Sequence, residues 1–196
     1  MMKDTALIVV DMLYDFIDGS MACHHAEEAV QASLAFIDKV TADTETDPTG
    51  VHDTFPILFV CDHHPADHCS FAAQGGPWPP HCVAGTRGGQ IHEALAPHAL
   101  EELTFFKGED PAREQYSGYE GKNMAGQSLS EVLALMDIKT VYVCGIATEY
   151  CVRNTCEDLL KAGYNVYLLQ EAIGYVEEEG HRKALPEMEA EGIRLV

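Results

Sequence analysis

The chain has 196 residues, of which 46% are apolar and 22% charged, a length and composition that predict a single globular domain over residues 1–196. The 32 acidic residues outnumber the 12 Lys and Arg residues, so the formal net charge at pH 7 is −20. A chain this acidic repels phosphate backbones and anionic lipid surfaces, and it lacks the run of about 18 apolar residues that crosses a bilayer, so we expect neither nucleic acid nor membrane as a partner.

Short apolar runs of strand length alternate along the chain with amphipathic stretches of helical length. Strands are expected at residues 5–11, 56–62, 103–107, 140–145 and 165–170, with a short last strand at about 193–196. Helices are expected at residues 27–40, 128–136, 150–162 and about 177–191. This alternation is typical of βαβ units, whose strands form a parallel sheet.

Two long segments connect these elements without a helical or strand pattern. Residues 41–54 are acidic and turn-rich, so we expect an exposed loop without chemistry. Residues 62–89 instead combine Pro and Gly with four histidines and the only tryptophan of the chain. Loops longer than about 15 residues are usually functional or disordered, and this one is too rich in His, Cys and aromatic residues for disorder. We expect it to form a wall of a site.

Polar or reactive side chains follow four of the predicted strands. Asp11 ends the first strand, Asp62 the second and Lys107 the third, and the fourth leads through a short turn to Cys151. Ligands of open α/β sheets bind outside the carboxyl ends of the strands. We therefore expect these four residues to meet at one edge of the sheet.

Cys151 is the candidate nucleophile because, among the seven cysteines, it alone follows a strand and opens a helix. The helix dipole and a nearby cation are expected to lower the pKa of its thiol. Asp11 would accept the thiol proton and Lys107 would favour the thiolate, as in covalent catalysis. Taken singly, Cys151 also fits a buried small residue, Asp11 a turn residue and Lys107 a solvated strand end. Their joint occurrence favours catalysis.

A second set of candidates has the composition of a metal site and consists of Asp62, His64, His68 and His81. A carboxylate with two or three imidazoles suits zinc, manganese or iron, and fewer than four protein ligands leave positions for water or substrate. The alternative is that the histidines of this loop are solvated. A structural zinc site is a further alternative, weakened by the lack of a CxxC pair, and its thiols would be Cys61, Cys69 and Cys82.

Two aromatic residues are placed to bind a planar ligand. Phe16 follows Asp11 by five residues, and Trp78 precedes His81 by three. Both would supply flat apolar walls, with core packing as the alternative. The turn Gly145-Ile146-Ala147 would direct backbone N–H groups, together with that of Cys151, at a developing oxyanion.

These residues resemble the isochorismatase-like hydrolase family, and within it the nicotinamidases, over essentially the whole chain. The matching stretches occur in the family's order and are ALIVVDMLYDF, DHHPADHCSF, GGPWPPHCVAGT, FFKG and GIATEYCV. The pair GGPWPPHCVAGT and GIATEYCV is highly specific. The resemblance implies an α/β fold with a six-stranded parallel sheet and helices on both faces.

The resemblance also implies roles for the candidate residues. The implied catalytic set is Asp11, Lys107 and Cys151. The implied metal ligands are Asp62, His64 and His81, whereas His68 matches a histidine that is a ligand in only some relatives. Ile146-Ala147 matches the family's cis peptide, and the aromatic pair that holds a pyridine ring is matched by Phe16 and Trp78.

Three features depart from the family pattern. The family often has DxQNDF where this chain has DMLYDF, so Leu13 and Tyr14 replace polar groups that usually support the pocket. His63 takes a position often held by an aromatic residue, and Glu149 one where Asp is usual. The first departure bears on fine substrate preference, and we expect it to shift KM more than the ranking of substrates. We expect the other two to leave the catalytic set intact.

The resemblance predicts hydrolysis of nicotinamide to nicotinate and ammonia through a cysteine thioester. We expect one divalent transition metal, zinc in the first place and manganese or iron as alternatives. The expected partner is the small-molecule substrate, and assembly into a homo-oligomer is left open. Rival interpretations are another amide or ureide hydrolase of the same fold, an isochorismate-type hydrolase that needs no thiol, and a catalytically silent metal-binding interaction module.

The cysteines and the first residues of the chain indicate the cellular compartment in which we expect the protein. The start MMKDTALIVVD lacks the small-residue cleavage site of a signal peptide. The seven cysteines lack the dense spacing of a disulfide scaffold. We therefore expect a cytoplasmic protein with mostly reduced thiols.

Overall fold

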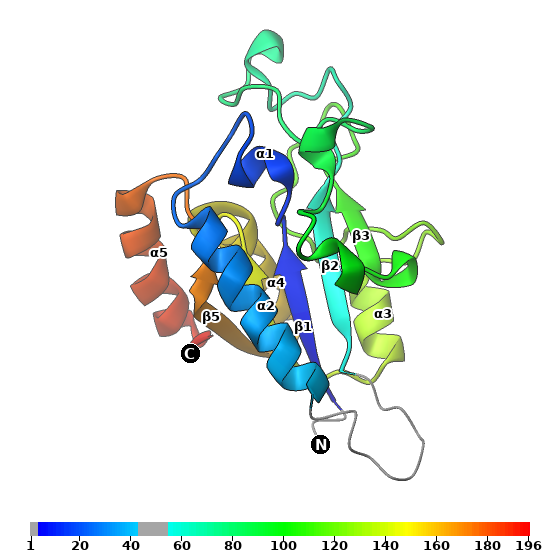
Figure 1. The fold of residues 1–196 in the computed structure, drawn as a ribbon, viewed down its shortest axis with the longest axis vertical. Helices are drawn as coiled ribbons and strands as arrows, with labels where there is room; N and C mark the ends of the chain where they lie inside the picture. The colour runs from blue at the N-terminus through cyan, green and yellow to red at the C-terminus, as the bar shows by residue number, and fades with distance from the viewer. Residues whose placement is uncertain (1–3, 43–54) are drawn as a thin grey trace.

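The structure is a computed structural model that describes residues 4–42 and 55–196 (Figure 1). Its centre is a sheet of six parallel strands in the spatial order β3-β2-β1-β4-β5-β6. The strands are β1 (Thr5–Val10), β2 (Ile57–Asp62), β3 (Thr104–Lys107), β4 (Thr140–Gly145), β5 (Asn165–Ile173) and β6 (Arg194–Leu195). The predicted six-stranded parallel sheet is therefore confirmed.

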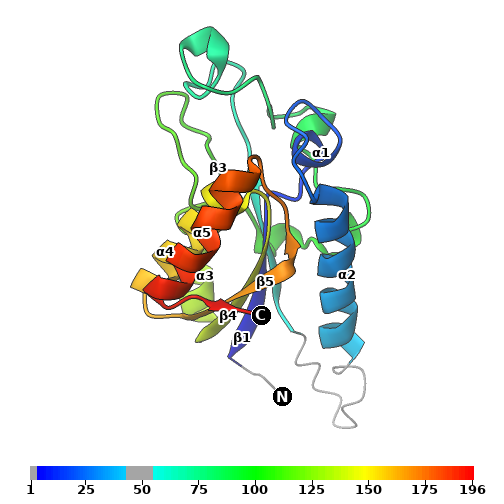
Figure 2. The same cartoon turned by 90° about the vertical axis from the view of Figure 1, so that its left-hand side faces the viewer.

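Helices cover both faces of the sheet, as predicted. Figure 2 shows α2 on one side and α3, α4 and α5 on the other. The helices are α1 (Tyr14–Ile17), α2 (Ala26–Ala42), α3 (Leu129–Leu135), α4 (Arg153–Lys161) and α5 (Glu178–Glu191). Shorter turns are η1 (Ala72–Gln74), η2 (Arg87–Gly89), η3 (Ala96–His98), η4 (Glu101–Leu103) and the π-helical turn η5 (Thr148–Val152). None of the helices in the described residues has the length and apolar character needed to cross a membrane.

The sheet separates two hydrophobic clusters, because successive side chains of a strand point to opposite faces. In β1, Ile8 and Val10 belong to the cluster on the side of α4 and α5, whereas Leu7 and Val9 belong to the cluster beneath α2. All six residues of β1 are buried. A strand covered on both faces has no polar side to show, which explains why it appears in the sequence as a continuous apolar run.

The observed elements differ from the predicted ones mainly at their ends. β5 continues to Ile173 instead of ending at residue 170. The helix expected at 150–162 begins as η5 and becomes α4 at Arg153. α1 has no predicted counterpart, because its four residues are too short to show helical periodicity. The loop expected at 41–54 begins inside α2, which ends at Ala42, and its residues 43–54 lie outside the described residues.

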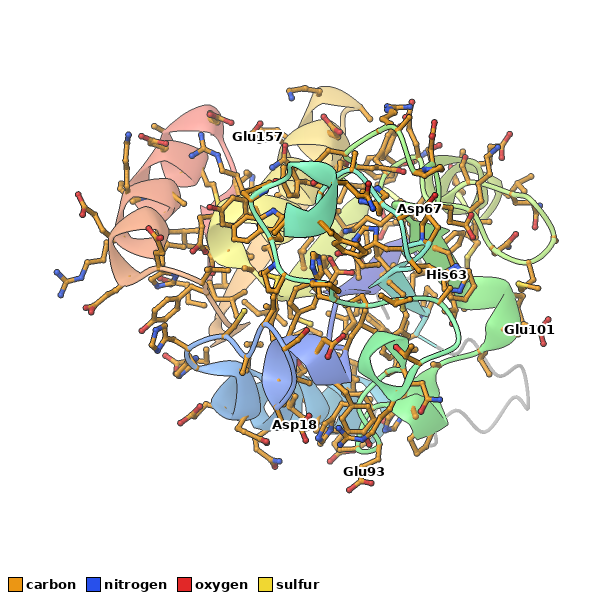
Figure 3. The ribbon with its side chains drawn as sticks, turned by 90° about the horizontal axis from the view of Figure 1, so that it is seen from above. Asp18, His63, Asp67, Glu93, Glu101 and Glu157 are labelled. Carbon is orange, nitrogen blue, oxygen red and sulfur yellow. The ribbon has the colours of Figure 1, made fainter. Side chains whose placement is uncertain are left out.

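The carboxyl ends of the strands meet at one edge of the sheet, where the predicted site residues lie. The strand register pairs Asp62 of β2 with Lys107 of β3, and Val10 of β1 with Gly145 of β4. Residues 63–89 cross above this edge at the top of Figure 1, and Figure 3 looks down on them. Isolated bridges, such as those of His64 with Val83 and of Phe71 with Trp78, fix that segment.

Candidate active site

Asp11 follows β1 in a backbone conformation that residues other than Gly rarely adopt. Its φ is +50°, in the left-handed region. The N–H of Asp11 donates to the carbonyl oxygen of Val60 at 2.8 Å, and its Oδ1 accepts the N–H of Asp62 at 2.7 Å. These two hydrogen bonds tie the end of β1 to β2. The carboxylates of Asp11 and Asp62 are consequently neighbours, and both residues are buried.

Lys107 ends β3 and contacts all three of the other residues predicted at the strand ends. Its Nζ lies 2.9 Å from Asp11 Oδ2 and donates to Cys151 Sγ at 3.3 Å. The same Nζ also donates to Asp62 Oδ1. The Lys107 side chain is fully buried, and a buried ammonium is costly unless opposite charges and hydrogen bonds compensate it. The structure thus brings these four residues together.

Burial and charge move the pKa values of this cluster in opposite directions. Burial and the Asp62 carboxylate raise the pKa of Asp11 to about 6, against the opposing effect of Lys107. Burial alone would lower the pKa of Lys107, but the carboxylates of Asp11 and Asp62 outweigh it and raise that pKa well above its ordinary value. Burial would raise the pKa of Asp62, but Lys107 and His64 outweigh it and hold that pKa below its usual range. Asp11 is therefore the carboxylate better suited to exchange a proton near neutral pH.

Cys151 lies in η5, the turn that leads from β4 into α4. Burial raises the pKa of its thiol well above the ordinary value, although Lys107 acts to lower it. The prediction of a lowered thiol pKa is therefore wrong, since burial and the nearby carboxylates outweigh the cation. A neutral thiol needs a base to become a nucleophile. Asp11 has an oxygen within 4.8 Å of Cys151 Sγ and is placed to be that base.

Asp62, His64 and His81 form a buried group of three potential metal ligands. These atoms all lie within 4.8 Å of one another, and His64 Nε2 is 3.5 Å from Asp62 Oδ2. The second ring nitrogen of each histidine is occupied, because His64 Nδ1 donates to Gly108 O at 2.9 Å and His81 Nδ1 donates to Pro79 O at 2.8 Å. Such bonds fix the ring and leave Nε2 as the nitrogen available to a metal ion. Burial also lowers the pKa of His81, which favours the neutral ring that a metal ligand requires.

His68 stays outside this set. Its ring lies 4.2 Å from that of His64, measured between centroids, but both of its nitrogens bind other groups. Nε2 donates to Arg113 O at 3.1 Å, and Nδ1 accepts the hydroxyl of Ser70 at 2.7 Å. The thiols of the alternative structural zinc site also stay apart: in the part of the chain that the structure describes, no group of ligand atoms at metal-binding spacing includes Cys61, Cys69 or Cys82.

A pocket opens onto Cys151 and the Asp62–His64–His81 set. Phe16 and Trp78 both line it. The Trp78 ring meets that of Tyr150 edge-on at 5.2 Å, and its Nε1 donates to the hydroxyl of Tyr116 at 3.3 Å. The pocket wall also contains Met21, Glu114, Tyr116, Ala147, Tyr150 and Val176.

Sequence reasoning misses most of this additional wall. Glu114 and Tyr116 lie between β3 and α3, Met21 follows α1, and Val176 follows β5. No local pattern marks these positions, because only the folded chain brings them to the pocket. Tyr150 carries one usable signal, its position directly before the candidate nucleophile.

The turn after β4 has the backbone form that the resemblance implies. The peptide bond between Ile146 and Ala147 is cis. Gly145 has a φ of +129°, and a Cβ there would lie 1.9 Å from the carbonyl oxygen of Val10, so only Gly fits. Ala147 lines the pocket beside Cys151. The backbone of this turn is therefore close to the candidate nucleophile.

The residues that depart from the family pattern lie outside the pocket wall. Leu13 is fully buried and forms a bridge with Ile91. The guanidinium of Arg87 lies 3.7 Å above the Tyr14 ring. His63, labelled in Figure 3, is 3.0 Å from Glu109.

Glu149, the remaining departure, joins the turn of Cys151 to the segment after β5. Its Oε1 accepts the N–H groups of Val176 at 2.9 Å and Glu177 at 2.7 Å. Val176 belongs to the pocket wall, so the hydrogen bond from its N–H to Glu149 helps to hold this part of the wall in place.

Known proteins are similar to this chain in both sequence and fold. Residues 5–196 match the isochorismatase domain. The chain is 33% identical to the nicotinamidase/pyrazinamidase of Mycobacterium tuberculosis over 194 residues, which cover 97% of each protein. It is similar to the crystal structure of the pyrazinamidase of Pyrococcus horikoshii in complex with zinc, with a TM-score of 0.84, 36% identity and 98% of each chain covered. It is also similar to the structure of PnC1 from L. infantum in complex with nicotinate, with a TM-score of 0.77, 29% identity and coverage of 100% of this chain and 93% of that one. The chain belongs to the isochorismatase family.

Proposed function

We propose that the chain is a nicotinamidase, an amidohydrolase that converts nicotinamide and water to nicotinate and ammonia. The observation that carries the proposal is the contact of Lys107 with both Asp11 and Cys151, beside a pocket lined by a metal-type donor set. A thiol with an adjacent base and a cation is the arrangement that covalent hydrolysis of an amide requires. The names of the similar proteins, among them a nicotinamidase/pyrazinamidase and a protein bound to nicotinate, agree with this substrate class.

The first half of the proposed reaction forms a bond between sulfur and the carboxamide carbon. Asp11 removes the proton from Cys151 Sγ as the sulfur attacks, and its pKa of about 6 suits it to accept that proton. Lys107, 3.3 Å from Sγ, stabilises the negative charge that develops there. The backbone N–H groups of Ala147 and Cys151 donate hydrogen bonds to the oxyanion of the tetrahedral intermediate.

The second half releases the two products. Asp11 transfers its proton to the leaving nitrogen, the C–N bond breaks, and ammonia departs from a nicotinoyl thioester on Cys151. Water then attacks the thioester carbon while Asp11 accepts one of its protons. When the C–S bond breaks, Asp11 returns its proton to sulfur, and the product leaves as nicotinic acid, which releases its proton to ammonia or solvent to give nicotinate. One water is consumed, and the free thiol is restored.

The donor set of Asp62, His64 and His81 fits a divalent transition ion, and we assign these residues as its ligands. One carboxylate and two imidazoles whose Nδ1 atoms are held by carbonyl oxygens form a set that zinc accepts, with positions left for other ligands. When bound, the ion supplies a Lewis-acidic contact for the pyridine nitrogen. Zinc is the favoured metal because the similar pyrazinamidase was crystallised with it, and manganese and iron are the alternatives.

We assign Phe16 and Trp78 as the residues that hold the pyridine ring. Both line the pocket, and aromatic side chains suit a flat, largely apolar ligand. The Phe16 ring lies 5.5 Å from that of His81, which places it beside the proposed metal ligands. The hydroxyl of Tyr116 accepts the indole N–H and so holds Trp78 at the pocket wall.

We further propose that the chain acts as a single catalytic domain in the cytoplasm. All seven cysteines are free, which agrees with a reducing compartment. The proposed partner is the small-molecule substrate.

Ammonia release from nicotinamide, measured with and without a metal chelator, tests this proposal. The expected result is turnover that chelation removes and added zinc restores. Greater activity on an aliphatic ureide than on nicotinamide would assign the chain to the rival hydrolases of the same fold. Bound metal without hydrolysis of any amide would favour a silent binding module.

A further inference from the structure

The carboxylate of Asp15 lies between α1 and the segment that carries His81. Its Oδ2 accepts the N–H of Cys82 at 2.7 Å, and its Oδ1 accepts the N–H of Ser20 at 3.2 Å. Asp15 directly precedes Phe16, and Cys82 directly follows His81. One carboxylate therefore joins the chain neighbours of a pocket-wall residue and of a proposed metal ligand.

Both backbone polar groups of Cys82, its N–H and its carbonyl oxygen, are hydrogen-bonded. Its N–H is bound by Asp15, and its carbonyl oxygen accepts the N–H of His64 at 3.0 Å. The φ of Cys82 is +47°, a region that residues other than Gly occupy only when their surroundings impose it. The hydrogen bond to Asp15 is thus one of the contacts that fix this turn, and the turn determines where the His81 ring lies relative to that of His64.

Two glycines lie so close to the Asp15 carboxylate that neither of their positions has room for a Cβ. A Cβ added to Gly88 would lie 2.0 Å from Asp15 Oδ2, and one added to Gly19 would lie 2.4 Å from Oδ1. The backbone at these two glycines therefore approaches the half-buried carboxylate closely. Its two hydrogen bonds to N–H groups give the carboxylate a defined position.

We propose that Asp15 is a positioning residue, which sets the place of His81 relative to Phe16 by holding the Cys82 N–H. This inference rests on the proposed function, because it takes His81 as a metal ligand and Phe16 as a wall for the pyridine ring. Asp15 itself is absent from the pocket wall, so it acts through these two neighbours. Asp11, Lys107 and Cys151 have no direct bond to it among the described contacts.

The variant Asp15→Asn tests this role with little change of volume. An amide has one acceptor oxygen, so it satisfies either Ser20 or Cys82 and turns an NH₂ group toward the other N–H. We expect the dissociation constant for zinc, measured by competition with a chromogenic chelator in the absence of substrate, to rise about 10- to 100-fold. The KM for nicotinamide should rise by a larger factor than kcat falls, because the residues that form and break bonds stay in place.

A second variant, Gly88→Ala, keeps Asp15 but pushes its carboxylate away from Cys82. It should weaken zinc binding in the same direction, and it decides the question if Asp15→Asn fails to fold. The matched control is Asp18→Asn, which removes an exposed ion pair with Arg87 from the next turn of the chain (Figure 3). The control should bind zinc and nicotinamide as the wild-type protein does.

The outcomes separate this inference from the proposed function. Wild-type zinc affinity in Asp15→Asn, or an equal loss in Asp18→Asn, would overturn the positioning role while leaving the nicotinamidase proposal in place. A wild-type protein that binds no zinc would overturn the proposed metal site and this inference together. A wild-type protein that binds zinc but does not hydrolyse nicotinamide would overturn the proposed function, while the zinc measurements on the two variants would still decide the role of Asp15.

Discussion

Lys107 donates a hydrogen bond to Cys151 across two intervening strands. Lys107 ends β3, at the edge of the sheet, whereas Cys151 follows β4, and β2 and β1 lie between them. The gap is bridged by the long lysine side chain, whose Nζ also contacts Asp62 and Asp11 at the ends of those two strands. One buried ammonium thus links the thiol, the proposed base and a proposed metal ligand. Substitution of any one of these four residues should therefore affect the other three.

The first prediction concerns the thiol. Cys151→Ala should remove nearly all turnover but leave nicotinamide binding measurable, because Phe16, Trp78 and the proposed metal ligands remain. Turnover by ammonia release and binding by calorimetry check both parts. Cys69→Ala, which removes a half-buried thiol outside the pocket wall, is the control and should stay active. If Cys151→Ala kept more than about a tenth of the wild-type kcat, a barrier change of only ~1.4 kcal/mol, the covalent mechanism would be wrong.

The second prediction concerns the buried charge of Lys107. Lys107→Met fills similar space but leaves the carboxylates of Asp11 and Asp62 without their cation. Breaking a buried ion pair in this way costs about 3–5 kcal/mol of the free energy of unfolding, which urea denaturation of the variant measures. Lys139→Met removes an exposed lysine that pairs with Asp137 and should leave the urea midpoint unchanged. Equal midpoints for the two variants would contradict the stabilising role of Lys107.

The positions of the strand-end residues could be predicted from the sequence, but their protonation could not. Asp11, Asp62 and Lys107 each end an apolar run, and the rule that parallel strands present their carboxyl ends at one edge brings them together. The pKa of Cys151 depends on how deeply the thiol is buried and on the two carboxylates beside it. Neither quantity is visible along the chain, and together they outweigh the cation that sequence reasoning did identify.

The loop over residues 62–89 also shows what the sequence could not predict about the proposed metal ligands. Composition identified His64, His68 and His81 as one group, yet His68 uses its nitrogens for Ser70 and Arg113. Arg113 is 45 residues from His68 along the chain. Long-range partners of this kind decide which histidine nitrogens remain free, and no local pattern records them.

The third prediction concerns the metal. Chelation, or His81→Ala, should weaken binding of pyridine carboxamides while the protein stays folded, because the ion is proposed to contact the ring nitrogen. The control is His63→Ala: this histidine faces Glu109 and should keep both metal and activity. Metal analysis and calorimetry provide the readouts. Fully active protein without a bound transition metal would refute the assignment of Asp62, His64 and His81.

The fourth prediction concerns Glu114, which the sequence did not identify. Glu114 lines the pocket. We expect its negative charge to repel the anionic product nicotinate more than the neutral substrate. Glu114→Gln should therefore strengthen product inhibition by nicotinate about two- to fivefold, the range expected of a partly solvated charge. The KM for nicotinamide should change less. Inhibition constants of the wild-type protein, Glu114→Gln and the control Glu109→Gln test this, and an unchanged constant for nicotinate in Glu114→Gln would exclude the effect.

The last prediction concerns the choice of substrate. A site that binds a ring nitrogen through a metal leaves one ligand position unsatisfied when an analogue lacks that nitrogen. Aromatic walls alone discriminate between substrates by only ~1–3 kcal/mol per small group. Pyrazinamide keeps a nitrogen in the equivalent place and should be hydrolysed, picolinamide has its nitrogen displaced and should be much poorer, and benzamide should be poor. Isochorismate should be untouched.

Leu13 and Tyr14 should not alter this ranking, because both lie outside the pocket wall and contact Ile91 and Arg87 instead. Substitution of either residue should shift KM for all pyridine carboxamides together. Values of kcat/KM for the four amides, measured side by side, decide the point. If picolinamide or benzamide matched nicotinamide, the ring nitrogen would have no metal contact, and the substrate would be selected by the aromatic walls of Phe16 and Trp78 alone.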